Sequence, residues 1–204
     1  MRRSPFALLA LLALACTAPA PGDSFYLDTI AADRAEKDRA FVDASDSPVP
    51  PEERDTFLPL SYYPPDLDYR VPAELQVAEE RPVFDMPTSA GKMRPMQRVG
   101  VLEFTLQGQS RTLSALIEVE NPNVDLLFVP FADATNGSET YDAGRYLELD
   151  LTMTGLYDLD FNRAFHPYCY YDDTYDCPFP PPENRLPTAI LAGERLPNPP
   201  TPNP

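Results

Sequence analysis

The chain has 204 residues and carries 32 acidic and 16 basic side chains, which gives a formal net charge of −16 at neutral pH. A surface this acidic repels the phosphates of nucleic acids, so nucleic acid is excluded as a partner. The length suits one domain that is able to bury a core of its own.

The N-terminus, MRRSPFALLALLALAC, is typical of an export signal. Two arginines precede an apolar run over residues 6–15, much shorter than the roughly 20 residues that a membrane-spanning helix needs. We predict a signal peptide over residues 1–15. Without Arg2 and Arg3, the mature chain keeps 14 basic residues against 32 acidic ones, a net charge of −18.

The residue after the predicted cleavage site is Cys16, directly behind a small residue. This order resembles the lipobox of bacterial lipoproteins, in which the cysteine is acylated and becomes the mature N-terminus. We expect a lipid anchor on Cys16 and a flexible spacer over residues 16–23, which makes the membrane the expected partner. Thr17 replaces the aspartate that would retain a lipoprotein at the inner membrane. The expected location is therefore the cell envelope, at the outer membrane where the host has one; the alternative is a plain secreted protein.

Residues 24–45 contain no glycine or proline and predict an amphipathic helix. One face carries four residues at roughly helical spacing: Leu27, Ile30, Arg34 and Phe41. A serine and proline cluster over residues 45–48 ends the helix. A short helical turn is expected over residues 51–57, followed by an aromatic, proline-broken stretch that lies against the core.

From about residue 69 the hydrophobic pattern changes to that of strands. Strands are predicted over residues 68–78, in a hairpin over 99–119 with its turn at 107–110, and over 124–133, 145–153 and 156–162. The chain is therefore predicted to form a mainly β (α+β) domain over residues 24–196. In this domain an N-terminal amphipathic helix precedes an antiparallel β-barrel or β-sandwich. Residues 197–204 predict a disordered, proline-rich tail.

Two stretches concentrate polar side chains. Residues 133–149 read DATNGSETYDAGRYLEL, and residues 160–194 contain the sole histidine, two cysteines and several tyrosines. Tyrosines of this kind stack on flat ligands or cap the core of a loop-rich face. We expect a polar face built from residues 133–145 and 160–184.

Three motifs in these stretches carry a family resemblance: VPFADATNGSETYDAGRYLEL, DFNRAFHPYC and CPFPPPENRLPTAILAGE. Over about residues 27–195 the chain resembles the bacterial family called domain of unknown function 1684, whose members are often described as lipoproteins. The resemblance implies a mostly β domain in the cell envelope and no established activity. Where the family commonly has Asn-Pro, this chain has His166-Pro167, which argues against His166 as an indispensable catalytic base.

The main hypothesis for function is a non-catalytic binding or structural module. The ligand-binding candidates are Asp133, Tyr141, Arg145, Asn162, Arg163, Tyr168 and Asn184. The alternative is a hydrolase that acts on a polar envelope or extracellular substrate through Asp160 with Glu139 or Glu183, since two carboxylates in one cleft serve as general acid and base. A structural alternative is that these polar groups satisfy the backbone of irregular loops.

Cys169 and Cys177 are expected to form a disulfide, because exported proteins mature in an oxidising compartment and acylation of Cys16 leaves these two cysteines. On the chain-entropy model such a loop contributes about 2–3 kcal/mol of stability. A metal site from His166, Cys169 and Cys177 is the other possibility, since these are ligand types for zinc or copper. No cofactor is expected, and common nucleophile and metalloprotease motifs are missing from the sequence.

Overall fold

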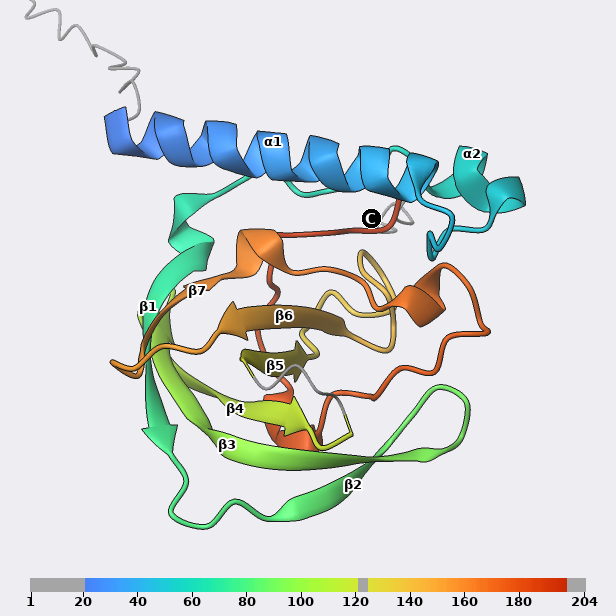
Figure 1. The fold of residues 1–204 in the computed structure, drawn as a ribbon. Helices are drawn as coiled ribbons and strands as arrows, with labels where there is room; N and C mark the ends of the chain where they lie inside the picture. The colour runs from blue at the N-terminus through green and yellow to red at the C-terminus, as the bar shows by residue number, and fades with distance from the viewer. Residues whose placement is uncertain (1–20, 121–124, 198–204) are drawn as a thin grey trace, which may run out of the picture.

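The structure is a computed structural model that describes residues 21–120 and 125–197. The strands are β1 (Arg70–Val77), β2 (Val83–Pro87), β3 (Met93–Leu106), β4 (Gln109–Glu118), β5 (Leu126–Phe131), β6 (Arg145–Asp150) and β7 (Leu156–Asp160). All neighbours are antiparallel, in the order β6-β5-β4-β3-β1-β7, and β2 pairs with β3. The sheet curls into a nearly closed barrel (Figure 1). The predicted mainly β fold is confirmed, in its barrel form.

The barrel core follows from the alternation of side chains along each strand. In β3, Leu102, Phe104 and Leu106 are buried while the residues between them lie at the surface or partly exposed. Gln107 and Gly108 then both have positive φ, 50° and 72°, as the tightest hairpin turns require. The predicted hairpin is therefore confirmed, with its turn in the predicted place.

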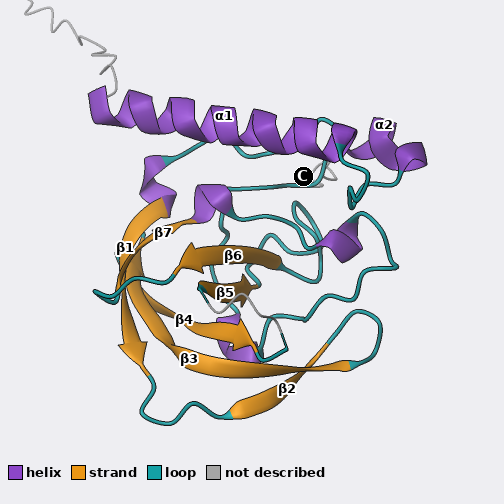
Figure 2. Ribbon diagram, viewed as in Figure 1, coloured by secondary structure: helices purple, strands orange, loops and turns teal. Residues whose placement is uncertain are grey.

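The helix α1 (Pro21–Asp43) lies across one end of the barrel, as Figure 2 shows. It begins three residues before the predicted start, and proline suits a first helical position because its missing N–H would have no partner there. The helix is less amphipathic than predicted, because only Tyr26, Ile30 and Phe41 are buried apolar residues on it. Polar contacts supply the rest of the attachment.

Three residues of α1 make polar contacts with the barrel and its loops. Arg34 donates to the carbonyl of Tyr63 at 3.0 Å, and Lys37 donates to Glu194 Oε1 at 2.5 Å. Tyr26 donates its hydroxyl proton to the carboxylate of Asp160. Charged residues on the buried side of α1 thus bind loops of the barrel.

The remaining helical elements are short. They are α2 (Arg54–Phe57) and the 3₁₀ turns η1 (Pro51–Glu53), η2 (Leu67–Tyr69), η3 (Phe161–Arg163), η4 (Tyr168–Tyr170) and η5 (Pro182–Asn184). The helical turn predicted over residues 51–57 is confirmed. No helix within the described residues combines the length and hydropathy that crossing a membrane requires.

The C-terminal segment of the described chain, residues 185–197, runs from η5 to a position beneath α1 (Figure 1). Just past the end of β5, the Ala132 carbonyl accepts from the Leu186 N–H at 2.8 Å. The segment also buries Ile190 and Ala192 in the core. The predicted signal peptide, Cys16 and the last seven residues of the predicted tail lie outside the described residues.

Candidate functional site

The outer face of the barrel carries aromatic residues where two strands meet. In β5, Leu127 and Val129 point into the core, so Phe128 between them points outward. Tyr146 and Glu148 lie on the same outer face of β6, on either side of buried Leu147. An outward strand face is usually polar and solvated, so aromatic rings there indicate that another segment covers the sheet.

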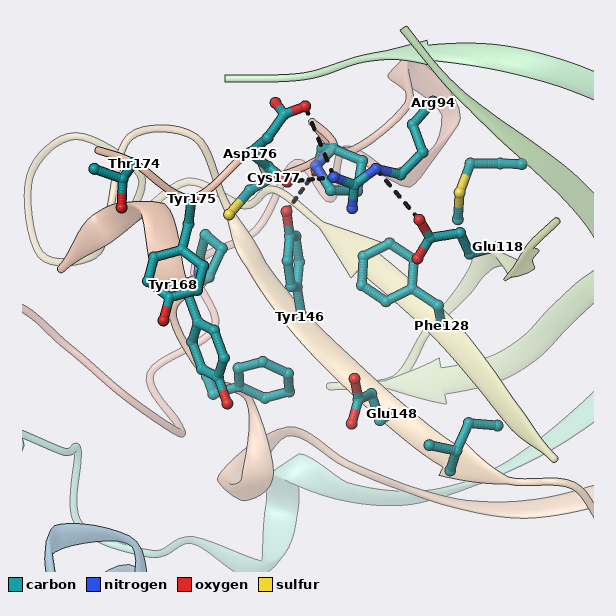
Figure 3. A pocket seen from close by; sticks show the side chains of 15 residues that line it. Arg94, Glu118, Phe128, Tyr146, Glu148, Tyr168, Thr174, Tyr175, Asp176 and Cys177 are labelled. Carbon is teal, nitrogen blue, oxygen red and sulfur yellow. Dashed lines mark hydrogen bonds and ion pairs between the residues drawn. The ribbon is translucent and has the colours of Figure 1, made fainter. Parts of the chain in front are cut away.

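Residues 165–178 provide that cover and leave a cavity of about 550 Å³ between themselves and the sheet (Figure 3). The strands contribute Arg94, Met96, Glu118, Leu126, Phe128, Tyr146 and Glu148 to its lining. The covering segment contributes Phe165, Pro167, Tyr168, Thr174, Tyr175, Asp176, Cys177 and Pro178. The volume lies in the range of small-molecule sites. The lining combines aromatic rings with four charged side chains, Arg94, Glu118, Glu148 and Asp176.

One end of the cavity is held together by Arg94. Its Nε lies 3.4 Å from Glu118 Oε1, and its Nη2 lies 3.8 Å from Asp176 Oδ2 and donates to the Asp176 carbonyl at 2.5 Å. Beside it, the Tyr146 hydroxyl donates to the carbonyl of Pro178 at 2.6 Å. These bonds attach the covering segment to β3 and β6, so this end of the cavity is preorganised.

Glu148 stands apart at the other end of the cavity, below Phe128 in Figure 3. Among the described residues Glu148 makes no hydrogen bond or ion pair. Its side chain is exposed to solvent. The surrounding protein raises the pKa of Glu148 by removing water from the carboxylate, and the more distant charge of Lys37 only partly opposes this. Within residues 21–120 and 125–197, Glu148 is therefore the carboxylate of the cavity that lacks a partner.

Two of the predicted ligand-binding residues, Asp133 and Arg145, form a buried ion pair instead of lining the cavity. Arg145 Nη2 lies 2.8 Å from Asp133 Oδ2, and both side chains are at most 1% exposed. Asp133 Oδ1 also accepts from the hydroxyl and the backbone N–H of Thr135. These contacts place both residues inside the protein, which favours the structural alternative for them.

Asn162 and Asn184 have the same kind of surroundings. Asn162 exchanges two hydrogen bonds with the backbone of Asp66, at 2.9 and 2.8 Å. Asn184 is fully buried; it accepts from Ser114 N and donates to the carbonyls of Ser114 and Pro130. Both amides therefore satisfy backbone groups of neighbouring segments.

The three carboxylates considered for a hydrolase lie in different neighbourhoods. Asp160 is buried and binds Tyr26 and Asn162. Glu139 accepts from the Tyr63 hydroxyl at 3.1 Å, while Glu183 is exposed and pairs with Arg98. In the described part of the chain these three carboxylates share no hydrogen-bond partner, so no acid and base pair is formed from them by direct contact.

Of the remaining candidates, Tyr168 lines the cavity, where its ring packs edge-on against Tyr175 with centroids 5.3 Å apart. Arg163 is about half exposed and pairs with Asp33, and Tyr141 packs against the ring of Tyr170.

The residues from the strands that line the cavity were not predicted from the sequence. The outward aromatic residues of β5 and β6 are the signal that would have indicated them.

Cys169 and Cys177 are adjacent thiols in the structure, and the Cys169 N–H donates to Cys177 Sγ at 3.1 Å. The hydrogen bond with Cys177 lowers the pKa of Cys169 to about 7, while the same bond and burial raise the pKa of Cys177. The two sulfurs are close enough to interact, and Cys177 lies in the cavity wall. The disulfide remains a prediction.

His166 is buried, and its two ring nitrogens face Tyr141 and Glu194, not the thiols of Cys169 and Cys177. Nε2 accepts the Tyr141 N–H at 3.3 Å, and Nδ1 lies 3.8 Å from Glu194 Oε2. Within residues 21–120 and 125–197, no three His, Cys, Asp or Glu side chains are grouped so that they could hold a metal ion. The geometry gives the metal alternative no support.

The buried histidine predicts how stability depends on pH. Burial lowers the pKa of His166 to about 3, against a weaker opposing effect of Glu194, whereas an unfolded histidine titrates near 6.5. Between these pH values the unfolded chain binds the extra proton, so stability falls as the pH falls, by up to about 1.4 kcal/mol per unit. Urea unfolding at about pH 7 and about pH 5.5 should differ by roughly 1 kcal/mol because of this residue.

The His166→Asn variant is the control for this measurement, because the chain has no second histidine. Whatever its overall stability, its unfolding free energy should lack this histidine-dependent step between the two pH values. An identical step in both proteins would show that His166 does not cause it.

Comparison with known proteins identifies the family of the chain. The model of the family described as protein of unknown function (DUF1684) matches residues 55–195. The chain belongs to this family. The structure is similar to the solution NMR structure of an uncharacterised protein from Haloarcula marismortui. The two sequences are 44% identical, and the TM-score of the two structures is 0.67. The match covers 85% of this chain and 96% of that chain.

No curated protein matches the chain. The DUF1684 match begins after α1 and includes every strand and the covering segment. The barrel and its outer cavity therefore lie entirely within the family domain.

Proposed function

We propose that this DUF1684 protein is a lipid-anchored envelope protein whose barrel binds a small molecule in the outer-face cavity, without catalysing a reaction on it. The observation that carries the proposal is the cavity itself, a space of about 550 Å³ with aromatic walls beneath residues 165–178. A well-formed cavity with aromatic lining and a few converging polar groups is the usual form of a small-molecule site.

Binding accounts for the site better than hydrolysis through the residues considered above. Paired-carboxylate hydrolysis of the glycosidase type needs two carboxylates within about 10 Å across an open cleft. Asp160 is buried and hydrogen-bonded, and Glu183 pairs with Arg98 at the surface. Neither Asp160 nor Glu183 lines the cavity, so a hydrolase that used them would act elsewhere than at this cavity.

The proposed membrane anchor draws on the sequence at Cys16 and on exposed apolar residues near the start of α1. Phe25 and Leu156 line one groove and are 76% and 61% exposed. Met153, in the neighbouring turn between β6 and β7, is fully exposed. Apolar side chains exposed together commonly mark a contact with lipid or protein.

One mass measurement tests both chemical modifications that we propose for the cysteines. The protein purified from membranes should carry the mass of acyl chains, and the Cys16→Ser variant should lack them. Loss of two hydrogens in the same spectrum, reversed by reductant, would establish the proposed disulfide of Cys169 and Cys177. An unacylated protein in the soluble fraction would refute the anchor.

Binding in the cavity is tested by NMR titration of the mature domain with 2-phenylethanol and indole. Shift changes are expected in β5, β6 and residues 165–178. Tyr168→Ala should weaken binding by about two- to tenfold, the effect of losing a ring contact of about 0.5–1.5 kcal/mol. Phe25→Ala removes an exposed ring outside the cavity and should leave binding unchanged. Shift changes that are absent, or scattered over the surface, would contradict the proposal.

A further inference from the structure

We propose that the ligand of the cavity is a cation: a compound with a positively charged amine on an aromatic or short apolar body, with the amine held at Glu148. This inference rests on the proposed binding function and adds the chemical class of the ligand. It follows from the charges, the unpaired carboxylate and the rings that line the cavity.

The charged side chains in the lining leave the cavity negative. Arg94 is the one basic residue among them, against Glu118, Glu148 and Asp176. The guanidinium is already shared between Glu118 and Asp176, at 3.4 and 3.8 Å. An anionic ligand would therefore meet an occupied arginine, whereas a cationic ligand would supply the charge that the lining lacks.

Glu148 is the group that such a cation would bind. Within the described chain it has no hydrogen bond or ion pair, and Lys37, whose charge acts on it, is bound to Glu194 at 2.5 Å. A ligand amine in the cavity would give this carboxylate a charge-assisted hydrogen bond, which is among the stronger kinds.

Aromatic rings beside Glu148 suit the same ligand. Phe128 lies directly across the β5–β6 ladder from Glu148, and Phe165 and Tyr168 face the cavity from the covering segment. Ring faces carry partial negative charge and attract ammonium groups, most strongly where water is excluded. The rings also provide apolar surface for the body of the ligand. Carboxylate and rings together therefore favour an amine with an apolar part.

The test compares three probes of nearly equal shape on the mature domain: 2-phenylethylamine, 2-phenylethanol and phenylacetate, which are cationic, neutral and anionic. The amine should bind about tenfold more tightly than the alcohol, as expected for one close charge pair in a partly screened site, and phenylacetate should bind weakest. Glu148→Gln should reduce the affinity for the amine to that of the alcohol and leave the alcohol unaffected.

Two further variants complete the design. Glu103→Gln makes the same change in net charge on an exposed residue of β3 outside the cavity, so it should leave the affinity for the amine unchanged. Glu148→Lys should reverse the preference and favour phenylacetate. If the alcohol binds in the cavity and the amine binds no more tightly, the cation inference fails while the binding function stands. If none of the three probes binds, both fail.

Discussion

Replacing Arg145 with methionine is expected to lower the free energy of unfolding by about 3–5 kcal/mol, the range for removing one member of a buried ion pair. The guanidinium is completely buried and lies 2.8 Å from the Asp133 carboxylate. It also donates to the backbone carbonyls of Ile190, Ala192 and Glu194. Methionine would fill much of the space but would leave the carboxylate without its counter-charge and the carbonyls without donors.

Equilibrium unfolding in urea measures this loss, and Arg163→Met is the matched control. Arg163 pairs with Asp33 at 2.8 Å, but these side chains are 48% and 44% exposed. Its Nε also lies 3.4 Å from Asp160 Oδ2, a buried carboxylate that keeps its hydrogen bonds from Tyr26 and Asn162 in the variant. Exposed pairs contribute at most about 1 kcal/mol, so the control should change stability little. Losses of equal size in the two variants would mean that Arg145 does not join the C-terminal segment to the barrel.

The second large effect is expected at Gly193, whose substitution by alanine should cost about 2–5 kcal/mol of stability. Gly193 has a φ of +77°, where an alanine is disfavoured by about 1–2 kcal/mol. An added Cβ would also lie 2.5 Å from the carbonyl oxygen of Ala164 and 2.7 Å from that of Phe161. Such overlap forces the backbone to shift, at a cost of about 1–3 kcal/mol.

Gly91→Ala separates the two causes. Gly91 has nearly the same φ, +72°, but an added Cβ there meets nothing within 4 Å. Only the conformational cost of about 1–2 kcal/mol should remain, as measured by urea or thermal unfolding. If the two alanine variants are equally stable, the close approach of the C-terminal segment to η3 does not constrain Gly193.

The strands that the sequence predicted are those with clear local signals. Alternation in β1 and β3, together with the glycine turn, is visible within a few residues and depends on no distant partner. By contrast, β2 (Val83–Pro87) was not predicted, because it is short, ends in proline and buries only Met86 completely. Its strand form depends on pairing with β3, which the local pattern does not indicate.

The attachment of α1 shows a similar limit. The helix itself was predicted from composition and spacing, but Arg34 and Lys37 turned out to bind the backbone of Tyr63 and the side chain of Glu194. Those partners are distant in sequence. Helical periodicity placed Arg34 on the same face as Ile30 and Phe41 but left Lys37 among the charges between them. In neither case does it identify the partner in a loop of the barrel.

The candidate site was only partly predictable for a related reason. The polar residues led us to predict a binding face over residues 133–145 and 160–184. In the structure, however, Arg145 and Asn184 are buried and form hydrogen bonds that hold segments of the fold together. The cavity arises where the covering segment meets the outside of β5 and β6. Phe128 looked like part of a continuous apolar strand, and only the observed register shows that it faces away from the core.

The covering segment and the residue after it also pair with two edge strands of the sheet, β6 and β2. At its start, Phe165 exchanges two backbone hydrogen bonds with Tyr146 in β6. Just past its end, Phe179 donates to the carbonyl of Pro87, the last residue of β2. Both strands are edge strands, whose unpaired backbone groups would otherwise invite another chain to pair with them and aggregate. Lifting this segment would uncover both edges at once, so its attachment also protects the sheet against pairing with another chain.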